Sequence, residues 1–310
     1  MIEDKYNRGR NIMENIIKKI LEKENIKYNE FIKATSGFTN LVYFIDDEFV
    51  IKISKEAEVK KKLNKETAIY QNIKLPYIPK FIASGVIDDF QYSVITKLKG
   101  CSLYSIWHTL TAEERHSCVR QIAEILKAFN RQEYIFLDNE YKDFDWVGTM
   151  REDLMSKSNA LNEMGFDTSD IDKFVLSTLS NLFSQNTFGL VYNDAHFDNF
   201  IYDGGKLSLI DFDRVRACPI DYEMLIFKTM TENPLKFASE EDEDKIKEED
   251  YADIYEQFKN EYPEMFKGID AEKRISIYQF NYLMGQAIKC KDFQWINELL
   301  HGFSAQLKVN

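Results

Sequence analysis

The 310-residue sequence predicts an α+β protein of two lobes, a small one rich in antiparallel strands and a larger, mainly helical one. Short β-prone segments separated by turn residues follow an initial helix. Apolar residues at helical spacing dominate from Thr111 onward. Residues 97–100, KLKG, mark the change from strand to helix. We therefore expect residues 1–98 to form the first lobe and 99–310 the second.

The composition is that of an ordinary soluble protein, with 44% hydrophobic residues and no apolar run long enough to span a membrane. The N-terminal segment lacks the continuous apolar region of a signal peptide, so we expect a cytoplasmic protein. The net charge of −12 argues against nucleic-acid binding, because a phosphate backbone requires a basic face. An acidic surface usually serves solubility, and it also suits a cationic small molecule. The four cysteines lack metal or disulfide spacing and are expected to be reduced thiols.

The first lobe is predicted to begin with an amphipathic helix and to continue as an antiparallel meander. The helix is expected over residues 11–23, because isoleucines recur there at helical spacing. Turn residues at 36–37 and 46–48 separate the first three strands. The predicted strands cover residues 31–32, 41–45, 49–53, 80–86 and 91–98, with a helix over 57–73 between the third and the fourth.

A lysine interrupts the apolar strand over residues 49–53. Lys52 would point inward on this strand, where it requires an anion, and nucleotide phosphates would supply one. The following helix places Glu66 beside its apolar face, where it is the expected partner of Lys52. The alternative is that both charges lie solvated at an edge of the lobe.

The stretch 191–214 contains more carboxylates and amides than a folding core requires. Asp194 and Asn199 precede a short strand over residues 200–202, and Asp211 follows a second apolar run. A hairpin with Gly204 and Gly205 in its turn would bring Asp194, Asn199 and Asp211 to one cavity. Oxygen ligands without cysteine or paired histidine suit Mg²⁺. The alternative is that these residues only cap turns.

Residues 192–199, YNDAHFDN, and 210–212, IDF, resemble the aminoglycoside phosphotransferase and choline kinase family, whose segments read H-G-D-x-H-x-x-N and I-D-F/W. The resemblance implies a bilobal protein-kinase-like fold and transfer of the γ-phosphoryl of ATP or GTP to a small-molecule hydroxyl. Asp194 would be the catalytic base, and Asn199 and Asp211 would hold Mg²⁺. The opening His-Gly of the family is Tyr192-Asn193 here, a departure that concerns the support of the loop.

The resemblance also implies nucleotide contacts in the first lobe. Segment 36–40, SGFTN, stands where a kinase has its phosphate-covering loop, although a lone glycine equally fits a plain turn. Backbone groups at the end of the last strand would bind the nucleotide base. The candidate nucleotide-binding residues are therefore Lys52, Glu66, Ser36, Thr39, Asn40, Thr96 and Leu98.

Three further features surround the catalytic stretch. His196 is expected to support the catalytic loop. Asp221, or an acid within two positions of it, is expected to steady the same loop, and Arg214 and Arg216 would pair with it or face solvent. The acidic run over residues 239–253 is either a solvated surface or an acidic rim for a polycationic substrate.

The function expected from the sequence is that of a small-molecule kinase. The leading acceptor is an aminoglycoside-type antibiotic, followed by a metabolic alcohol such as choline or a sugar. A protein acceptor is disfavoured, because no activation segment ending in A-P-E follows Asp211. A nucleotide-binding module without catalysis is the alternative from another class. The sequence does not distinguish ATP from GTP or a monomer from a dimer.

Overall fold

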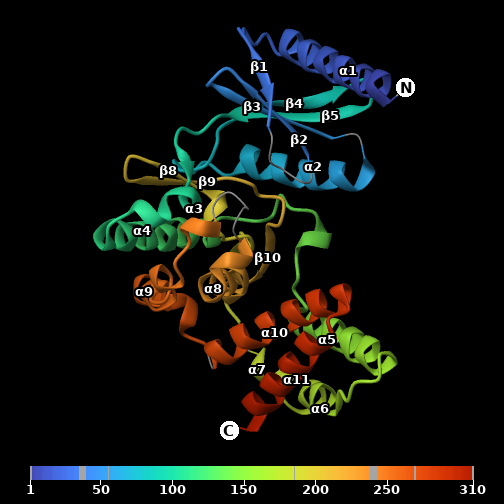
Figure 1. Cartoon of the computed structure of the whole chain (residues 1–310), viewed down its shortest axis with the longest axis vertical. Coiled ribbons are helices and arrows are strands. Elements are labelled where there is room, and N and C mark those ends of the chain that lie inside the picture. Colours follow the sequence, from blue (N-terminus) through green and yellow to red (C-terminus); the bar gives the residue numbers. More distant parts are fainter. Residues whose placement is uncertain are drawn as a thin grey trace. The chain divides into compact units, whose positions relative to one another are not determined.

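The computed structural model describes residues 2–34, 40–54, 56–184, 186–237, 243–268 and 270–308, and Figure 1 shows their arrangement. The chain divides into two compact units. The first contains Met1–Cys101, Ile201–Gly204 and Ser208–Arg214, and the second contains Ser102–Phe200, Gly205–Leu207 and Val215–Asn310. The predicted division assigned every residue after 98 to the second lobe, whereas two short later segments make their contacts with the first unit. The predicted bilobal α+β class is confirmed.

The first unit is built on a five-stranded antiparallel sheet with strand order β1-β2-β3-β5-β4. Its predicted strands are confirmed within two residues at each end. Asp46 and Asp88 adopt left-handed backbone conformations in the hairpin turns, which aspartate tolerates better than most residues. The strands are β1 (Phe31–Lys33), β2 (Leu41–Ile45), β3 (Phe49–Ser54), β4 (Phe81–Ile87) and β5 (Phe90–Thr96).

Two helices cover this sheet, and Figure 1 shows them on opposite sides of it. Helix α1 (Ile2–Lys23) begins earlier than predicted and packs Ile16, Ile17 and Ile20 into the core of the sheet. Helix α2 (Ala57–Asn72) packs against β3 and β5. This second contact fixes the face of α2 that meets the strand carrying Lys52.

Two strand pairs frame the catalytic stretch. Strand β7 (Phe188–Val191) pairs with β10 (Arg216–Pro219), so the residues just before and just after the predicted catalytic stretch lie side by side. Strands β8 (Phe200–Asp203) and β9 (Lys206–Leu209) form the predicted hairpin, beside the short β6 (Cys101–Ser102). Gly204 and Gly205 have positive φ in its turn, as a tight hairpin requires.

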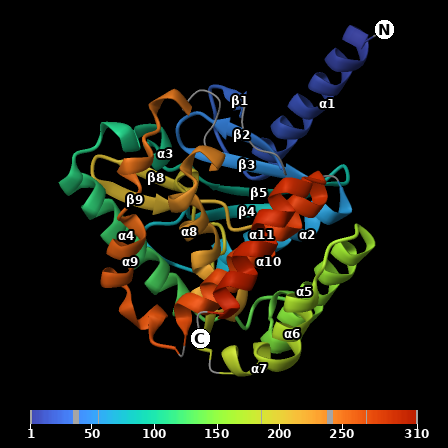
Figure 2. The same cartoon turned by 60° about the horizontal axis from the view of Figure 1, so that its bottom comes forward.

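The rest of the second unit is helical. A capping box of Thr111 and Glu114 begins its long helix α4, which satisfies otherwise unpaired backbone N–H groups. Figure 2 shows α5, α6, α7, α10 and α11 gathered at one end of the unit. The helices are α3 (Leu103–Ile106), α4 (Ala112–Asn130), α5 (Trp146–Glu163), α6 (Ser169–Ser177), α7 (Leu179–Leu182), α8 (Met224–Glu232), α9 (Ile254–Glu261), α10 (Ala271–Cys290) and α11 (Phe293–Lys308).

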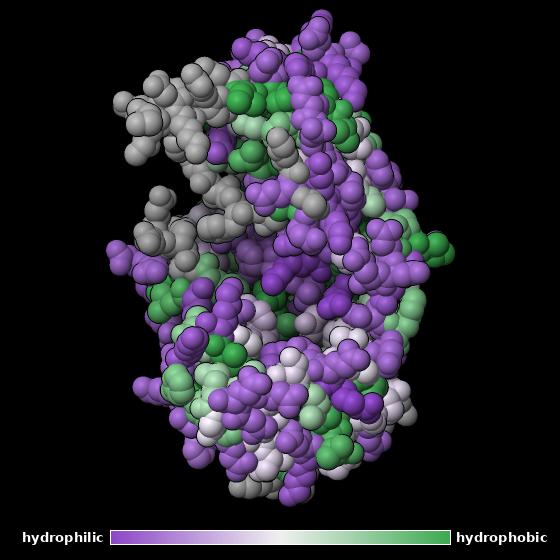
Figure 3. Space-filling model, turned by 90° about the vertical axis from the view of Figure 1, so that its right-hand side faces the viewer, coloured by the Kyte–Doolittle hydropathy of each residue, from purple (hydrophilic) through white to green (hydrophobic). Residues whose placement is uncertain are grey.

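On the face shown in Figure 3, hydrophobic residues form small separate patches among polar ones. None of the helices within the described ranges is both long enough and apolar enough to cross a bilayer. All four cysteines are free thiols, as predicted, with Cys118 and Cys218 buried.

Candidate active site

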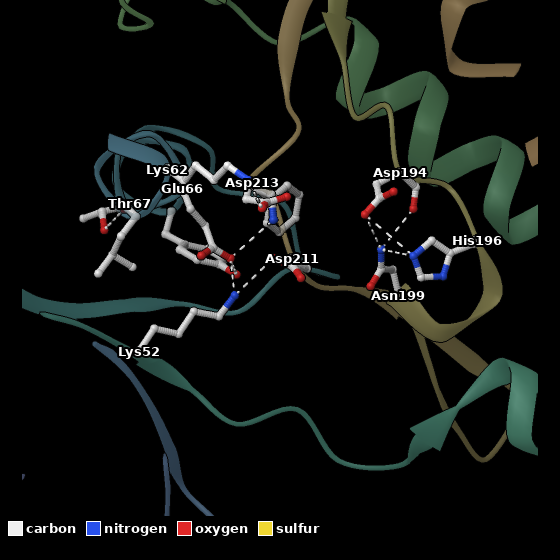
Figure 4. Close-up of polar contacts among 12 residues, drawn as sticks. Lys52, Lys62, Glu66, Thr67, Asp194, His196, Asn199, Asp211 and Asp213 are labelled. Atoms are coloured by element: carbon white, nitrogen blue, oxygen red, sulfur yellow. Dashed lines mark hydrogen bonds and ion pairs between the residues drawn. The ribbon is translucent and has the colours of Figure 1, made fainter. Parts of the chain in front are cut away.

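A buried ion pair joins the sheet of the first unit to its helix α2. Lys52 Nζ lies 2.6 Å from Glu66 Oε1, as predicted, and 3.3 Å from Asp211 Oδ1 (Figure 4). The Glu66 side chain is 0% exposed and that of Lys52 is 12% exposed. Burial by itself would lower the pKa of Lys52, but the charges of Glu66 and Asp211 outweigh burial and raise this pKa above its usual value. Lys52 is therefore a permanent cation held at a defined position.

The metal segment predicted at Asp211 adopts an unusual backbone. Asp211 has a φ of 61°, in the left-handed region that few residues other than glycine adopt. The next residue, Phe212, is buried, and its N–H donates to Glu66 Oε1 at 3.3 Å. Asp213 lies 3.9 Å from Lys62 of α2. Strained conformations of this kind persist where surrounding contacts hold them, and they cluster at functional sites.

Asn199 holds together residues 192–199 of the second unit, the predicted catalytic loop. Its Nδ2 donates to Asp194 O at 3.0 Å and to Asp194 Oδ2 at 3.2 Å, and it lies 3.0 Å from His196 Nε2 (Figure 4). The Asp194 side chain is 14% exposed. His196 therefore contacts the loop as predicted. Asp194 and Asn199 belong to the second unit and Asp211 to the first, so their convergence at one cavity stays a prediction.

The Tyr192-Asn193 departure from His-Gly is accommodated by the local backbone. Asn193 has a φ of 60°, a left-handed conformation that glycine adopts freely and asparagine adopts more readily than other residues. Tyr192 is completely buried, and its ring packs edge-on against Phe129 with centroids 6.3 Å apart. The loop thus keeps the turn that glycine would supply, while tyrosine adds apolar packing beneath it.

Glu223, rather than the predicted Asp221, supports the catalytic loop. Glu223 is fully buried and accepts hydrogen bonds from the N–H groups of Tyr192 at 2.8 Å and Asn193 at 2.9 Å. Asp221 instead accepts from Arg274 Nε at 2.6 Å. Both acids lie in the 3-10 helix η4 (Ile220–Glu223), whose turn directs one acid toward α10 and the other toward the loop. The prediction named Asp221 with an uncertainty of up to two positions, and the structure places Glu223, two positions later, against the loop.

Arg216 has a partner other than Asp221. Its guanidinium forms an ion pair with Asp143, a residue that the sequence did not indicate. Asp143 also donates its backbone N–H to Ala217 O of β10, at 2.9 Å. This contact holds the segment before α5 against the strand pair that frames the loop.

Replacing Glu223 with glutamine is expected to change how stability depends on pH. Burial raises the pKa of Glu223 to about 7, against the lowering effect of the hydrogen bonds from Tyr192 and Asn193. Because the folded pKa exceeds the usual 4.5, Glu223 stabilises the fold fully below that value, and this contribution is lost as the pH rises toward 7. Glutamine cannot titrate. The free energy of unfolding of the wild type should therefore fall relative to that of E223Q between about pH 5 and about pH 7.5.

Urea unfolding of both proteins at the two pH values measures this difference. E223Q should also lower kcat about tenfold, because one backbone N–H would face an amide N–H instead of an acceptor. E261Q, at an exposed position of α9, is the control and should follow the wild type. Parallel pH curves for wild type and E223Q would contradict the prediction.

The remaining nucleotide-binding candidates are only partly described. Ser36 and Thr39 lie outside the described residues. Within the described ranges, Asn40 Oδ1 is buried and has no hydrogen-bond partner. The N–H of Thr96 donates to Lys80 O at 2.9 Å, and its hydroxyl accepts from Lys80 N at 2.9 Å, so both groups are engaged in the sheet. Leu98 lies beyond the end of β5 and is half-buried.

The oxygen atoms that remain available match the preferences of Mg²⁺. Asn199 uses its Nδ2 on the loop, and in the described part of the chain its Oδ1 has no hydrogen-bond partner. Asp211 uses Oδ1 on Lys52, and its side chain is 44% exposed. Amide and carboxylate oxygens are hard ligands, and Mg²⁺ is commonly held by one or two protein groups together with substrate phosphates. The predicted metal ligands therefore have suitable chemistry.

A pocket of about 640 Å³ lies between α8, α9 and the start of α10 in the second unit. Glu256 and Glu272 lie within 3.2 Å of Lys259, and Glu232 lies 3.4 Å from Lys228. Glu248 and Glu249 belong to the acidic run, and no ion-pair partner is seen for them among the residues that the structure describes. The pocket is lined by Lys228, Thr231, Glu232, Pro234, Glu248, Glu249, Tyr251, Ala252, Tyr255, Glu256 and Glu272.

Solved structures of other proteins have a similar fold. The complex of streptomycin, ATP and APH(2")-IIa has a TM-score of 0.62 at 19% identity, covering 93% of this chain and 95% of that one. The GDP complex of aminoglycoside 2'-phosphotransferase-IIIa has a TM-score of 0.63 at 16% identity, covering 94% and 98%. A choline/ethanolamine kinase family protein from Mesorhizobium loti has a TM-score of 0.52 at 12% identity, covering 91% and 89%. These likenesses establish the fold.

The family follows from the sequence match. The model of the phosphotransferase enzyme family (APH) matches residues 30–253, which is more than half of the chain. The match includes both the Lys52 region and the catalytic stretch. This protein therefore belongs to the phosphotransferase enzyme family.

Proposed function

We propose that this phosphotransferase is a small-molecule kinase, which transfers the γ-phosphoryl of a Mg²⁺-bound nucleoside triphosphate to a hydroxyl of an aminoglycoside-type acceptor. The observation that carries the proposal is the cation Lys52, which is held by the buried Glu66 and shared with Asp211. Kinases use this set to bind nucleotide phosphates and metal. The similar folds solved with ATP and with GDP support a nucleotide donor without deciding between ATP and GTP.

In the first unit, the protein groups would bind the donor. Lys52 would contact the α- and β-phosphates, and Asp211 would offer its carboxylate to Mg²⁺. When bound, Mg²⁺ supplies positive charge that neutralises the phosphoryl group during transfer. Asn40, together with Ser36 and Thr39, would donate to phosphate oxygens. Backbone groups at Thr96 and Leu98 would contact the nucleotide base.

In the second unit, Asp194 would act on the acceptor. Its carboxylate would accept the hydrogen bond of the attacking hydroxyl and then take its proton. The new P–O bond would form as the bond from the γ-phosphorus to the bridging oxygen breaks, and the nucleoside diphosphate would leave. Asn199 would offer its free Oδ1 to the metal. Glu223 and His196 would hold the loop so that Asp194 keeps its orientation. These roles require no covalent intermediate on the protein.

The acidic pocket favours a cationic acceptor. Five of its lining residues are glutamates, and among the residues that the structure describes Lys228 and Lys259 are the lysines that pair with them. A polycation that enters the pocket would lose part of its hydration, and contacts with several carboxylates would compensate for that loss. The rings of Tyr251 and Phe197 lie with centroids 5.8 Å apart, which connects the pocket wall to the catalytic loop. Solved structures of similar fold include complexes with streptomycin and with gentamicin.

Choline is the second candidate acceptor. Tyr251 and Tyr255 line the same pocket, and aromatic rings bind quaternary ammonium groups through cation–π contacts. A choline/ethanolamine kinase family protein also shares the fold. A neutral sugar could donate hydrogen bonds to the glutamates but would gain no charge attraction from them, so it ranks after both cations.

Reversing two pocket charges is expected to weaken acceptor binding. In E248K/E249K, the KM for a polycationic acceptor should rise about tenfold or more, because attraction becomes repulsion over distances of a few ångströms. The KM for the nucleotide should stay unchanged. The matched control is E152K/E163K, which makes the same charge change at exposed positions of α5. An equal rise in the control would show that only net charge matters.

The test of the proposed function is ADP and GDP release by purified protein with Mg²⁺, ATP or GTP, and a panel of aminoglycosides, choline and sugars. Release stimulated by an aminoglycoside supports the proposal, and release stimulated only by choline supports the second candidate. Tight Mg²⁺-dependent nucleotide binding without release for any acceptor would instead support a nucleotide-binding module.

A further inference from the structure

Tyr70 is a buried residue of α2 that contacts Glu66 and the residue after Asp211. It is 1% exposed and lies one helical turn after Glu66. Its hydroxyl donates to Glu66 Oε1 at 2.9 Å. Its ring packs edge-on against Phe212, with centroids 5.3 Å apart. One side chain therefore contacts both the partner of Lys52 and the metal segment.

The hydroxyl of Tyr70 completes the environment of a buried carboxylate. Glu66 Oε1 accepts from Lys52 Nζ, Tyr70 Oη and Phe212 N, whereas Oε2 is buried and has no partner among the described residues. When a carboxylate accepts hydrogen bonds through one oxygen only, the donors to that oxygen determine the orientation of its side chain. Removing the Tyr70 donor would leave Glu66, and with it Lys52, less precisely placed.

The ring of Tyr70 also contacts the segment with the strained backbone. Phe212, which this ring meets edge-on, directly follows Asp211, the residue with a φ of 61°. Burial raises the pKa of Tyr70 well above its usual value, and the charges of Glu66 and Asp211 raise it further. The phenol therefore stays protonated and remains a donor to Glu66 across the accessible pH range.

We propose that Tyr70 is a positioning residue for phosphoryl transfer, and that its hydroxyl sets Lys52 and Asp211 in the arrangement that binds the metal–nucleotide complex. This inference rests on the proposed function. The alternative role is plain packing, in which only the ring matters. Phenylalanine keeps the ring and removes the hydroxyl, so it separates the two roles.

The test compares Y70F with a matched variant, Y92F. Tyr92 of β5 is also fully buried in the first unit, and its hydroxyl also donates to a glutamate, Glu24, which lies outside the site. We expect Y70F to raise the Mg²⁺ concentration at half-maximal rate about tenfold and to lower kcat by a similar factor, because a hydrogen bond to a charged group is lost. The KM for the acceptor should not change. Y92F should match the wild type in all three quantities.

Binding supplies a readout that does not depend on turnover. Calorimetric titration with a non-hydrolysable ATP analogue should show about tenfold weaker binding to Y70F in the presence of Mg²⁺ and a smaller change in its absence. Thermal unfolding establishes that both variants fold. Wild-type values for Y70F, or equal losses in Y70F and Y92F, would overturn the proposal for Tyr70. A wild-type protein that binds no Mg²⁺-nucleotide would overturn the proposed function, and this inference with it.

Discussion

Replacing Asp194 with asparagine is expected to abolish phosphoryl transfer while leaving nucleotide affinity nearly unchanged. Asparagine has the size of aspartate. Its side-chain oxygen can still accept the hydrogen bond that Asn199 Nδ2 donates to Asp194 Oδ2 at 3.2 Å in the wild type. It cannot accept a proton from the acceptor hydroxyl. General-base catalysis typically contributes about 10²–10⁴-fold, so kcat should fall by that range. Steady-state release of nucleoside diphosphate and calorimetric binding of Mg²⁺-nucleotide measure the two quantities.

Asp198 provides the control for this substitution, because it lies in the same loop. Its carboxylate accepts from the Ser102 hydroxyl at 2.6 Å, so D198N changes a structural contact. We expect D198N to lower kcat by less than about tenfold, as the loss of one hydrogen bond implies. Turnover by D194N at the wild-type rate would refute the assignment of Asp194 as the base.

Replacing Lys52 with methionine is expected to remove turnover and also to destabilise the protein. Glu66 is 0% exposed, and K52M would leave its charge buried without the cation. Breaking a buried pair by removing one partner typically costs about 3–5 kcal/mol. The free energy of unfolding should fall by roughly that amount in urea titrations. The phosphates of the nucleotide would also lose their cation, so nucleotide affinity should fall as well.

Two further variants separate stability from function. K62M removes another lysine near the metal segment, but the Lys62 side chain is 52% exposed, and such pairs contribute about 0–1 kcal/mol. K52M/E66Q removes the buried charge, while the glutamine oxygen still accepts from Tyr70. The double variant should regain most of the lost stability without regaining turnover. Full stability in K52M alone would contradict the ion-pair argument.

Local patterns in the sequence predicted most of the sheet and the helix beside it. Strands β2 and β3 are short runs of β-branched, aromatic and other apolar residues between turn residues, and this composition indicates a strand without tertiary contacts. Lys52 was recognisable because a charge inside an apolar strand requires a partner, and Glu66 lay at the right place on the next helix. The order and spacing of Asp194, Asn199 and Asp211 resemble the motifs of a phosphotransferase family, and this resemblance indicated the reaction class. The spacing is visible in the sequence because a short loop and a hairpin separate the three residues.

Features that depend on how distant segments pack were not predictable in this way. Asp221 and Glu223 are both acids next to the same helix, and only the turn of η4 directs Glu223 to the catalytic loop. By sequence alone Tyr70 fits an apolar helix face, and its contacts with Glu66 and Phe212 appear only in three dimensions. The pairing of Arg216 with Asp143 joins residues 73 positions apart.

The amino-acid sequence by itself therefore determined the fold class and the reaction class, and it named the residues predicted to perform the chemistry. The fold class and the reaction class can be inferred from local periodicity and from short motif spacings, and both can be recognised without knowing how distant segments pack. The tertiary structure decided which acid supports the loop, which hydroxyl holds Glu66 and where unpaired glutamates line a pocket. Those features depend on burial and on hydrogen-bond direction, and both are set only when segments far apart in the chain pack together.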